Sequence, residues 1–102
     1  MLRITERAVS ELQRTLADHE DPRLRLRVFI NHQCKCGTVR FAMELEREVR
    51  SGDREFDVVG IPFVADERTF PELPAAEVGY VDDFMVRGFT VRNVNHDCSG
   101  HR

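Results

Sequence analysis

Residues 24–45 read LRLRVFINHQCKCGTVRFAMEL and contain two runs in which hydrophobic residues occupy every second position. The first run spans residues 24–30 and the second spans residues 39–45, and arginine or glutamate side chains fall on their opposite faces. A period of two is typical of half-buried strands. The sequence therefore predicts an antiparallel strand pair joined by residues 31–37. That loop carries Cys34 and Cys36, and the only lysine of the chain, Lys35, lies between them.

Upstream of this pair, residues 5–18 have hydrophobic side chains spaced four apart and predict a helix that begins at Thr5 and ends before Pro22. Downstream, short hydrophobic runs predict strands at residues 56–59, 61–64, 78–81 and 84–92. Pro62 lacks an amide hydrogen, so we expect the strand at 61–64 at a sheet edge or beside a bulge. Asp66 is placed to cap a short helix that Pro71 and Pro74 end early.

These elements predict a single domain over residues 1–102 with an α+β, mostly β, fold. We expect a small curved antiparallel sheet or sandwich, an N-terminal helix and one short helix. Residues 94–102 are polar and rich in small side chains, and we expect them to form a flexible tail.

The composition argues against several classes of function. A formal net charge of −3 over 102 residues gives no reason to expect nucleic acid or an anionic membrane surface as a partner. The sequence has no run of 18 apolar residues, which a membrane helix needs, and its first residues contain no apolar core of a signal peptide. We therefore expect a cytoplasmic protein. Three cysteines are then expected to be free thiols or metal ligands rather than disulfides.

The residues best suited to bind a metal fall in two short stretches, 32–36 and 96–101. They are Cys34, Cys36, Cys98, His32, His96 and His101. Thiolates and imidazoles are the usual zinc ligands, and thiolates hold iron–sulfur clusters. A cluster commonly needs four thiolates and one chain has three, so two chains can supply the set across a symmetric interface. We expect the fold to bring the two stretches together.

Several segments together resemble the HesB/IscA-like family, the A-type iron–sulfur carriers. Residues 4–8 are similar to the opening helix of that family, residues 24–28 to its first strand, and residues 79–82 and 88–93 to its closing hairpin. The resemblance implies a homodimer or higher oligomer that binds iron or a [2Fe–2S] or [4Fe–4S] cluster. It also implies transfer to apo-proteins in contact with the assembly machinery, without enzymatic activity.

The cysteine distribution is the reverse of the family pattern, which has one cysteine in the loop and two near the C-terminus. Here Cys34 and Cys36 lie in the loop, Cys98 takes the first C-terminal place, and Gly100 takes the second. The resemblance implies Cys34, Cys36 and Cys98 as cluster ligands, and His101 is a further candidate for metal. Two alternatives stay open: a mononuclear zinc or iron site, and a thiol redox or protein-interaction module without a cluster.

Overall fold

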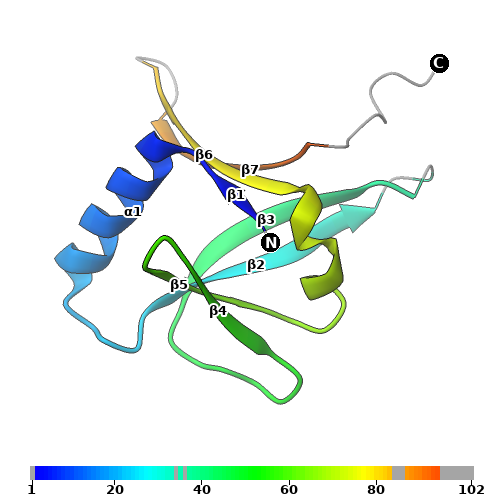
Figure 1. Ribbon diagram of the computed structural model, residues 1–102, viewed down its shortest axis with the longest axis horizontal. Helices are drawn as coiled ribbons and strands as arrows, with labels where there is room; N and C mark the ends of the chain where they lie inside the picture. The colour runs from blue at the N-terminus through cyan, green and yellow to red at the C-terminus, as the bar shows by residue number, and fades with distance from the viewer. Residues whose placement is uncertain (1, 34, 36, 84–86, 95–102) are drawn as a thin grey trace.

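The computed structural model describes residues 2–33, 35, 37–83 and 87–94, and the account below is restricted to them. Short strands and two helical segments alternate along this part of the chain (Figure 1). In chain order they are β1 (Arg3–Ile4), α1 (Glu6–His19), β2 (Arg25–Gln33), β3 (Val39–Glu46), β4 (Arg54–Val58), β5 (Ile61–Ala65), the 3₁₀ helix η1 (Phe70–Ala75), β6 (Ala76–Asp82) and β7 (Arg87–Asn93).

The strands form two sheets, one of order β1-β6-β7 and one of order β3-β2-β5-β4. The predicted α+β, mostly β, fold with a strand pair at β2 and β3 is confirmed. Two pairs are parallel, however, because β2 pairs with β5 and β1 pairs with β6 in the same direction. The sheets are therefore mixed, and the alternation of side chains alone carries no information on strand direction.

Helix α1 forms because Thr5 caps its first turn and one of its faces is apolar. The Thr5 hydroxyl oxygen accepts a hydrogen bond from the Ala8 amide at 3.2 Å, as the sequence predicts for an N-cap. Glu20 ends the helix in the left-handed conformation, at φ 53°. Ala8 and Leu12 are fully buried, so the helix contributes to the core through this face.

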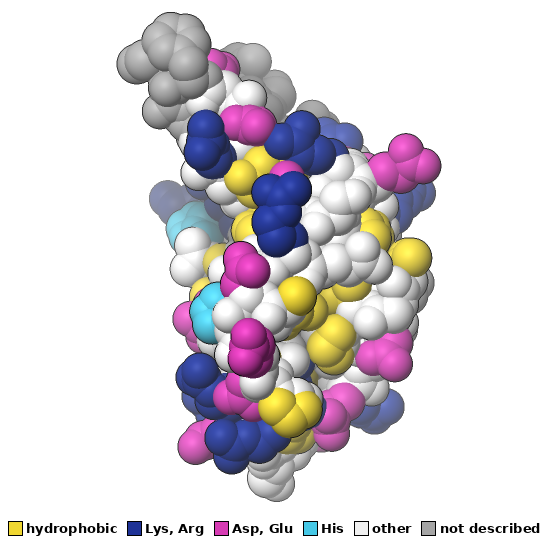
Figure 2. Space-filling view, turned by 90° about the vertical axis from the view of Figure 1, so that its left-hand side faces the viewer, with side chains coloured by type: hydrophobic (Ala, Val, Ile, Leu, Met, Phe, Trp, Pro, Cys, Tyr) yellow, Lys and Arg dark blue, Asp and Glu magenta, His cyan; other side chains and the backbone are white. Residues whose placement is uncertain are grey.

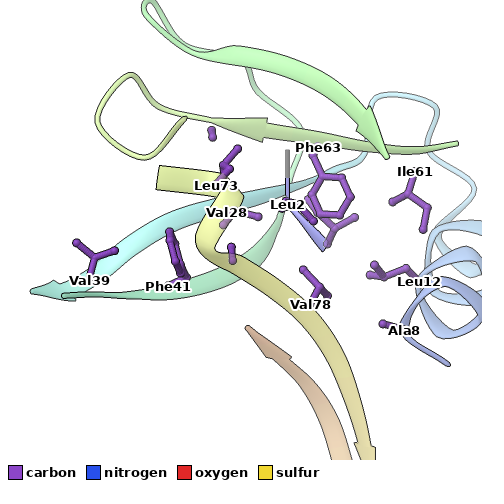
Figure 3. Packing of buried hydrophobic residues seen from close by; sticks show 13 residues of the cluster. Leu2, Ala8, Leu12, Val28, Val39, Phe41, Ile61, Phe63, Leu73 and Val78 are labelled. Atoms are coloured by element: carbon purple, nitrogen blue, oxygen red, sulfur yellow. The ribbon is translucent and has the colours of Figure 1, made fainter. Parts of the chain in front are cut away.

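The core lies between the two sheets and α1 (Figure 3). Val28 from β2, Phe63 from β5 and Val78 from β6 are each at most 1% exposed. Full burial of such side chains stabilises the fold by about 1.5–3 kcal/mol each. The core therefore holds the two sheets together and fixes where the ends of their strands lie.

Arg27 is buried although its position in the alternating run predicts a solvent-facing side chain. Arg27 is 4% exposed, and its guanidinium donates to both carboxylate oxygens of Asp53, at 3.1 and 2.7 Å, and to Glu46 at 2.9 Å. These contacts hold the pKa values of Asp53 and Glu46 below their usual range. A buried charge is tolerated when it is paired in this way, and the network attaches the turn around Asp53 to β2.

Two smaller predictions were wrong. Strand β5 lies inside its sheet rather than at an edge, and Pro62 is tolerated because the pairing of β5 with β2 starts one residue later, at Phe63. The short helix does not end at Pro71 and Pro74 but contains both, as the 3₁₀ helix η1. Asp66 instead accepts a hydrogen bond from the Thr69 amide at 2.7 Å in the turn that precedes this helix.

Candidate functional site

The cysteine-bearing loop is carried by the ends of β2 and β3. The sequence predicts a loop from residue 31, but β2 continues to Gln33 and pairs with Val39 at the start of β3. The Gln33 side-chain amide donates to the Gly37 carbonyl at 3.3 Å, and Arg68 donates to the Gln33 side-chain oxygen at 3.1 Å. The base of the loop is therefore attached to a neighbouring turn as well as to the sheet.

A buried threonine fixes the last part of β2. Thr69 is fully buried, and its hydroxyl oxygen accepts a hydrogen bond from the Ile30 amide at 3.2 Å. The pairing of β2 with β3 shifts its register between Ile30 and His32. The hydroxyl therefore gives β2 a contact beyond its last pair with β5, which is Val28 with Ala65.

The end of β7 is joined to the start of β3. The Asn93 side-chain amide donates to the Val39 carbonyl at 2.8 Å, across 54 residues of sequence. One residue further, the Val94 amide donates to the Ala75 carbonyl at 2.7 Å. In Figure 1 the end of β7 lies beside β3 on the side of the molecule opposite α1. The fold thus brings the segment that leads to Cys98 next to the segment that follows Cys36.

An open cleft of about 500 Å³ lies at this junction. It is lined by Asn31, Arg40 and Phe41 from β2 and β3 and by residues 91–94 at the end of β7. Arg40 is exposed and lies opposite His32 in the β2–β3 pairing. Arg92 forms an ion pair with Glu77 at 2.7 Å. The cleft therefore combines two arginines with a partly apolar lining.

The predicted ligands themselves, Cys34, Cys36, Cys98 and His101, lie outside the described residues. So does His96, whereas His32 and Lys35 are described and both are exposed. Within the described ranges, no group of three or more His, Cys, Asp or Glu side chains is arranged to hold a metal ion. Ligation by the cysteines stays a prediction, and what the structure adds is the position of the chain on either side of them.

The sequence analysis did not identify the polar residues of the junction. Asn93 was noted as part of a family-like segment, but its role in joining β7 to β3 was not predicted. The hydrogen bond spans two sheets, and nothing in the local pattern of residues 88–93 indicates it. Arg40 was assigned only to the polar face of a strand, and that assignment is correct but incomplete.

A family model described as "iron-sulphur cluster biosynthesis" matches residues 1–99. The chain belongs to this iron–sulfur cluster biosynthesis family. It is 30% identical to the iron–sulfur cluster insertion protein ErpA of Serratia proteamaculans, over 92% of this chain and 82% of that protein. The family assignment from the sequence is thereby confirmed.

Two solved structures share the fold of this family member. One is Escherichia coli SufA, involved in biosynthesis of iron–sulfur clusters, with a TM-score of 0.70, 19% identity, and coverage of 93% of this chain and 82% of that chain. The other is IscA with the [2Fe–2S] cluster, with a TM-score of 0.61, 24% identity, and coverage of 93% and 84%.

The surface on the α1 side of the molecule carries charges of both signs (Figure 2). Basic side chains are interspersed there with aspartate and glutamate, and hydrophobic side chains are exposed between them. This face shows no extended region of positive charge of the kind that binds nucleic acid. In the part of the chain that the structure describes, no helix is long and apolar enough to cross a membrane.

Proposed function

We propose that this chain is an iron–sulfur cluster carrier that binds iron or a [2Fe–2S] or [4Fe–4S] cluster and transfers it to apo-proteins. Cys34, Cys36 and Cys98 are the proposed ligands, with His101 as an additional ligand when the cargo is a metal ion. The role is delivery rather than catalysis, and we place it in the cytoplasm. Family membership supports the general role, and the assignment of ligands rests on the junction between β3 and β7.

The observation that carries the proposal is the hydrogen bond between Asn93 and the Val39 carbonyl. Val39 follows Cys36 by three residues, and Asn93 precedes Cys98 by five. An extended chain advances at most about 3.3–3.6 Å per residue, so these tethers span at most roughly 11 and 18 Å. Because the two anchoring residues are in contact, a common binding point lies within reach of both thiols.

The number of thiols favours two copies of the chain around one cluster. Each chain supplies three cysteines, and a cluster commonly takes four thiolates. A homodimer about a two-fold axis offers two equivalent sets of ligands at one place. A site shared by two subunits is incompletely covered by either one, and such exposure suits a cluster that has to be handed to a recipient.

Anaerobic reconstitution of the full chain with iron and sulfide tests this function. The expected product is a coloured protein with thiolate-to-iron absorption, equal amounts of iron and acid-labile sulfide, and a dimer mass by light scattering. Cys36→Ser and Cys98→Ser should each lose the cluster. Arg14→Gln, an exposed change on α1, is the control and should keep it.

The same experiment separates the alternatives. One metal ion per chain without acid-labile sulfide indicates a mononuclear zinc or iron site. A folded, reduced and colourless protein without metal refutes the carrier function and leaves the thiol redox or interaction module.

A further inference from the structure

The cleft between β3 and β7 has an electrostatic character that differs from the chain as a whole. The chain carries a net charge of −3, yet the charged side chains that line the cleft are Arg40 and Arg92. Arg92 is paired with the carboxylate of Glu77 at 2.7 Å. The Arg40 side chain forms no hydrogen bond or ion pair with another described residue. An anionic group is therefore attracted to this side of an otherwise acidic protein.

Two more positive side chains lie at the same end of the molecule. Arg68 donates to Gln33 at the base of the cysteine loop, and Lys35 is an exposed residue of that loop. His32 lies across from Arg40 in the β2–β3 pairing. Two acidic residues, Asp66 and Glu67, precede Arg68, and one Asp66 carboxylate oxygen accepts from the Thr69 amide. These side chains add positive charge beside the cleft.

The rest of the lining suits a peptide rather than an inorganic anion. Phe41 is 6% exposed, and Val91 and Val94 are half-buried, so the floor offers apolar contact. Asn31 contributes a side-chain amide that is both donor and acceptor, whereas the Asn93 amide already donates to the Val39 carbonyl. A small ion contacts only the arginine and leaves the apolar floor exposed to water. An acidic segment with aliphatic side chains contacts both the arginine and the apolar floor.

The strands beside the cleft also favour an extended ligand. Among the described strands, β3 is the last strand of one sheet and β7 the last strand of the other, so each is paired on one side only. Unpaired strand edges present backbone donors and acceptors to an extended chain. A peptide in the cleft lies beside the segment that follows Cys36 and the segment that leads to Cys98, where a recipient has to meet the cargo.

We propose that this cleft is a docking site for an acidic, extended segment of a recipient protein, with Arg40 as its principal contact. The identity of the partner as a recipient rests on the function proposed above. The binding of an acidic peptide does not, because it depends only on the described residues of the cleft.

Titration of the metal-free, full-length protein with a blocked peptide of alternating glutamate and leucine tests the proposal. A peptide with glutamine in place of glutamate is the neutral control, and binding is followed by NMR chemical shifts at low ionic strength. We expect saturable binding with the largest shifts at Asn31, Arg40 and Asn93. Arg40→Gln should weaken binding at least fivefold, and Arg14→Gln, which removes the same charge from α1, should change it less than twofold.

Three results would overturn the docking site. They are no saturable binding, equal binding of the neutral peptide, and equal weakening by the two arginine variants, which would indicate an effect of overall charge. If Arg40→Gln instead dissociates an oligomer and no peptide binds, the cleft is filled by a second copy of the chain. Cluster loading is measured separately, so a protein that loads a cluster but binds no peptide keeps its function and loses this site.

Discussion

Replacing Asn93 with alanine removes the side-chain amide that joins the end of β7 to the start of β3. The hydrogen bond to the Val39 carbonyl is 2.8 Å long and partly buried, and its loss leaves that carbonyl without this donor. A hydrogen bond contributes about 0.5–1.5 kcal/mol, and an unsatisfied buried partner costs about 1–3 kcal/mol. Because the site is only partly buried, we expect Asn93→Ala to lower the free energy of unfolding by about 1–2 kcal/mol.

Two assays together show whether this contact matters for the site. Thermal unfolding should give a lower Tm, by about 4–8 °C for each kcal/mol in a domain of about this size. Anaerobic reconstitution at a temperature where the variant is fully folded should then give less iron per chain. The reason is that the segment before Cys98 is no longer held beside the segment after Cys36.

Asn31→Ala is the matched control, because Asn31 lines the same cleft but its side chain forms no hydrogen bond with a described residue. Its free energy of unfolding should change by less than about 0.5 kcal/mol, as is usual for surface substitutions. The reasoning would be refuted if Asn93→Ala had the stability and the iron content of the parent protein. It would also be refuted if the two alanine variants lost iron to the same extent.

Three further predictions concern stability. Arg27→Leu leaves the buried carboxylate of Asp53 without its partner and should lower the free energy of unfolding by about 3–5 kcal/mol at pH 7. The double variant Arg27→Leu/Asp53→Leu should recover much of this loss, and chemical denaturation measures both. Arg27 lowers the pKa values of Asp53 and Glu46 in the folded protein. The two carboxylates should therefore contribute fully to the free energy of unfolding above the unfolded carboxylate pKa of about 4, and this contribution should be lost as the pH falls through the lower folded values. An acid titration in which the free energy of unfolding increases below pH 4 would contradict this. Val59 is 67% exposed, has φ at 51° and is followed by Gly60. Because asparagine tolerates this left-handed conformation better than a β-branched side chain does, Val59→Asn should raise the free energy of unfolding by about 1 kcal/mol. A destabilised variant in the same denaturation assay would show that the turn is not strained.

The parts of the fold that the sequence predicts are those with a local cause. Thr5 and the four-residue spacing of α1 predict the helix within one residue at its start. The period of two at residues 24–30 and 39–45 predicts the pairing of β2 with β3. Both patterns depend on residues close in the chain, so they can be recognised without knowledge of the tertiary structure.

The parts that the sequence does not predict depend on contacts between distant segments. Arg27 has the spacing of a solvent-facing side chain and is buried because Asp53, 26 residues away, neutralises it. The parallel pairing of β2 with β5 is set by the connection that carries the chain from β3 at one edge to β4 at the other edge of the same sheet, and an alternating pattern is the same in both directions. Pro62 would require an edge strand only if β5 were paired on both sides at that residue, but at Pro62 it is paired with β4 alone.

The candidate site also has a part that the sequence predicts and a part that it does not. Residue types and the family-like segments suffice to nominate Cys34, Cys36 and Cys98, because thiolate chemistry is a property of the side chain. The cleft and its two arginines could not be predicted, since Arg40 and Arg92 belong to different sheets. Only the packing of β7 against β3 makes them neighbours.

The most direct test of the account is whether Cys36 and Cys98 approach one another in the folded, metal-free protein. A Cys34→Ser variant, treated with a short reagent that links two thiols and then digested, reports this by mass spectrometry. We predict a Cys36–Cys98 link, within one chain or between two, at a yield well above that of the same protein unfolded in guanidinium. Equal yields in the folded and unfolded protein, with each cysteine modified separately, would contradict a shared site for the two thiols.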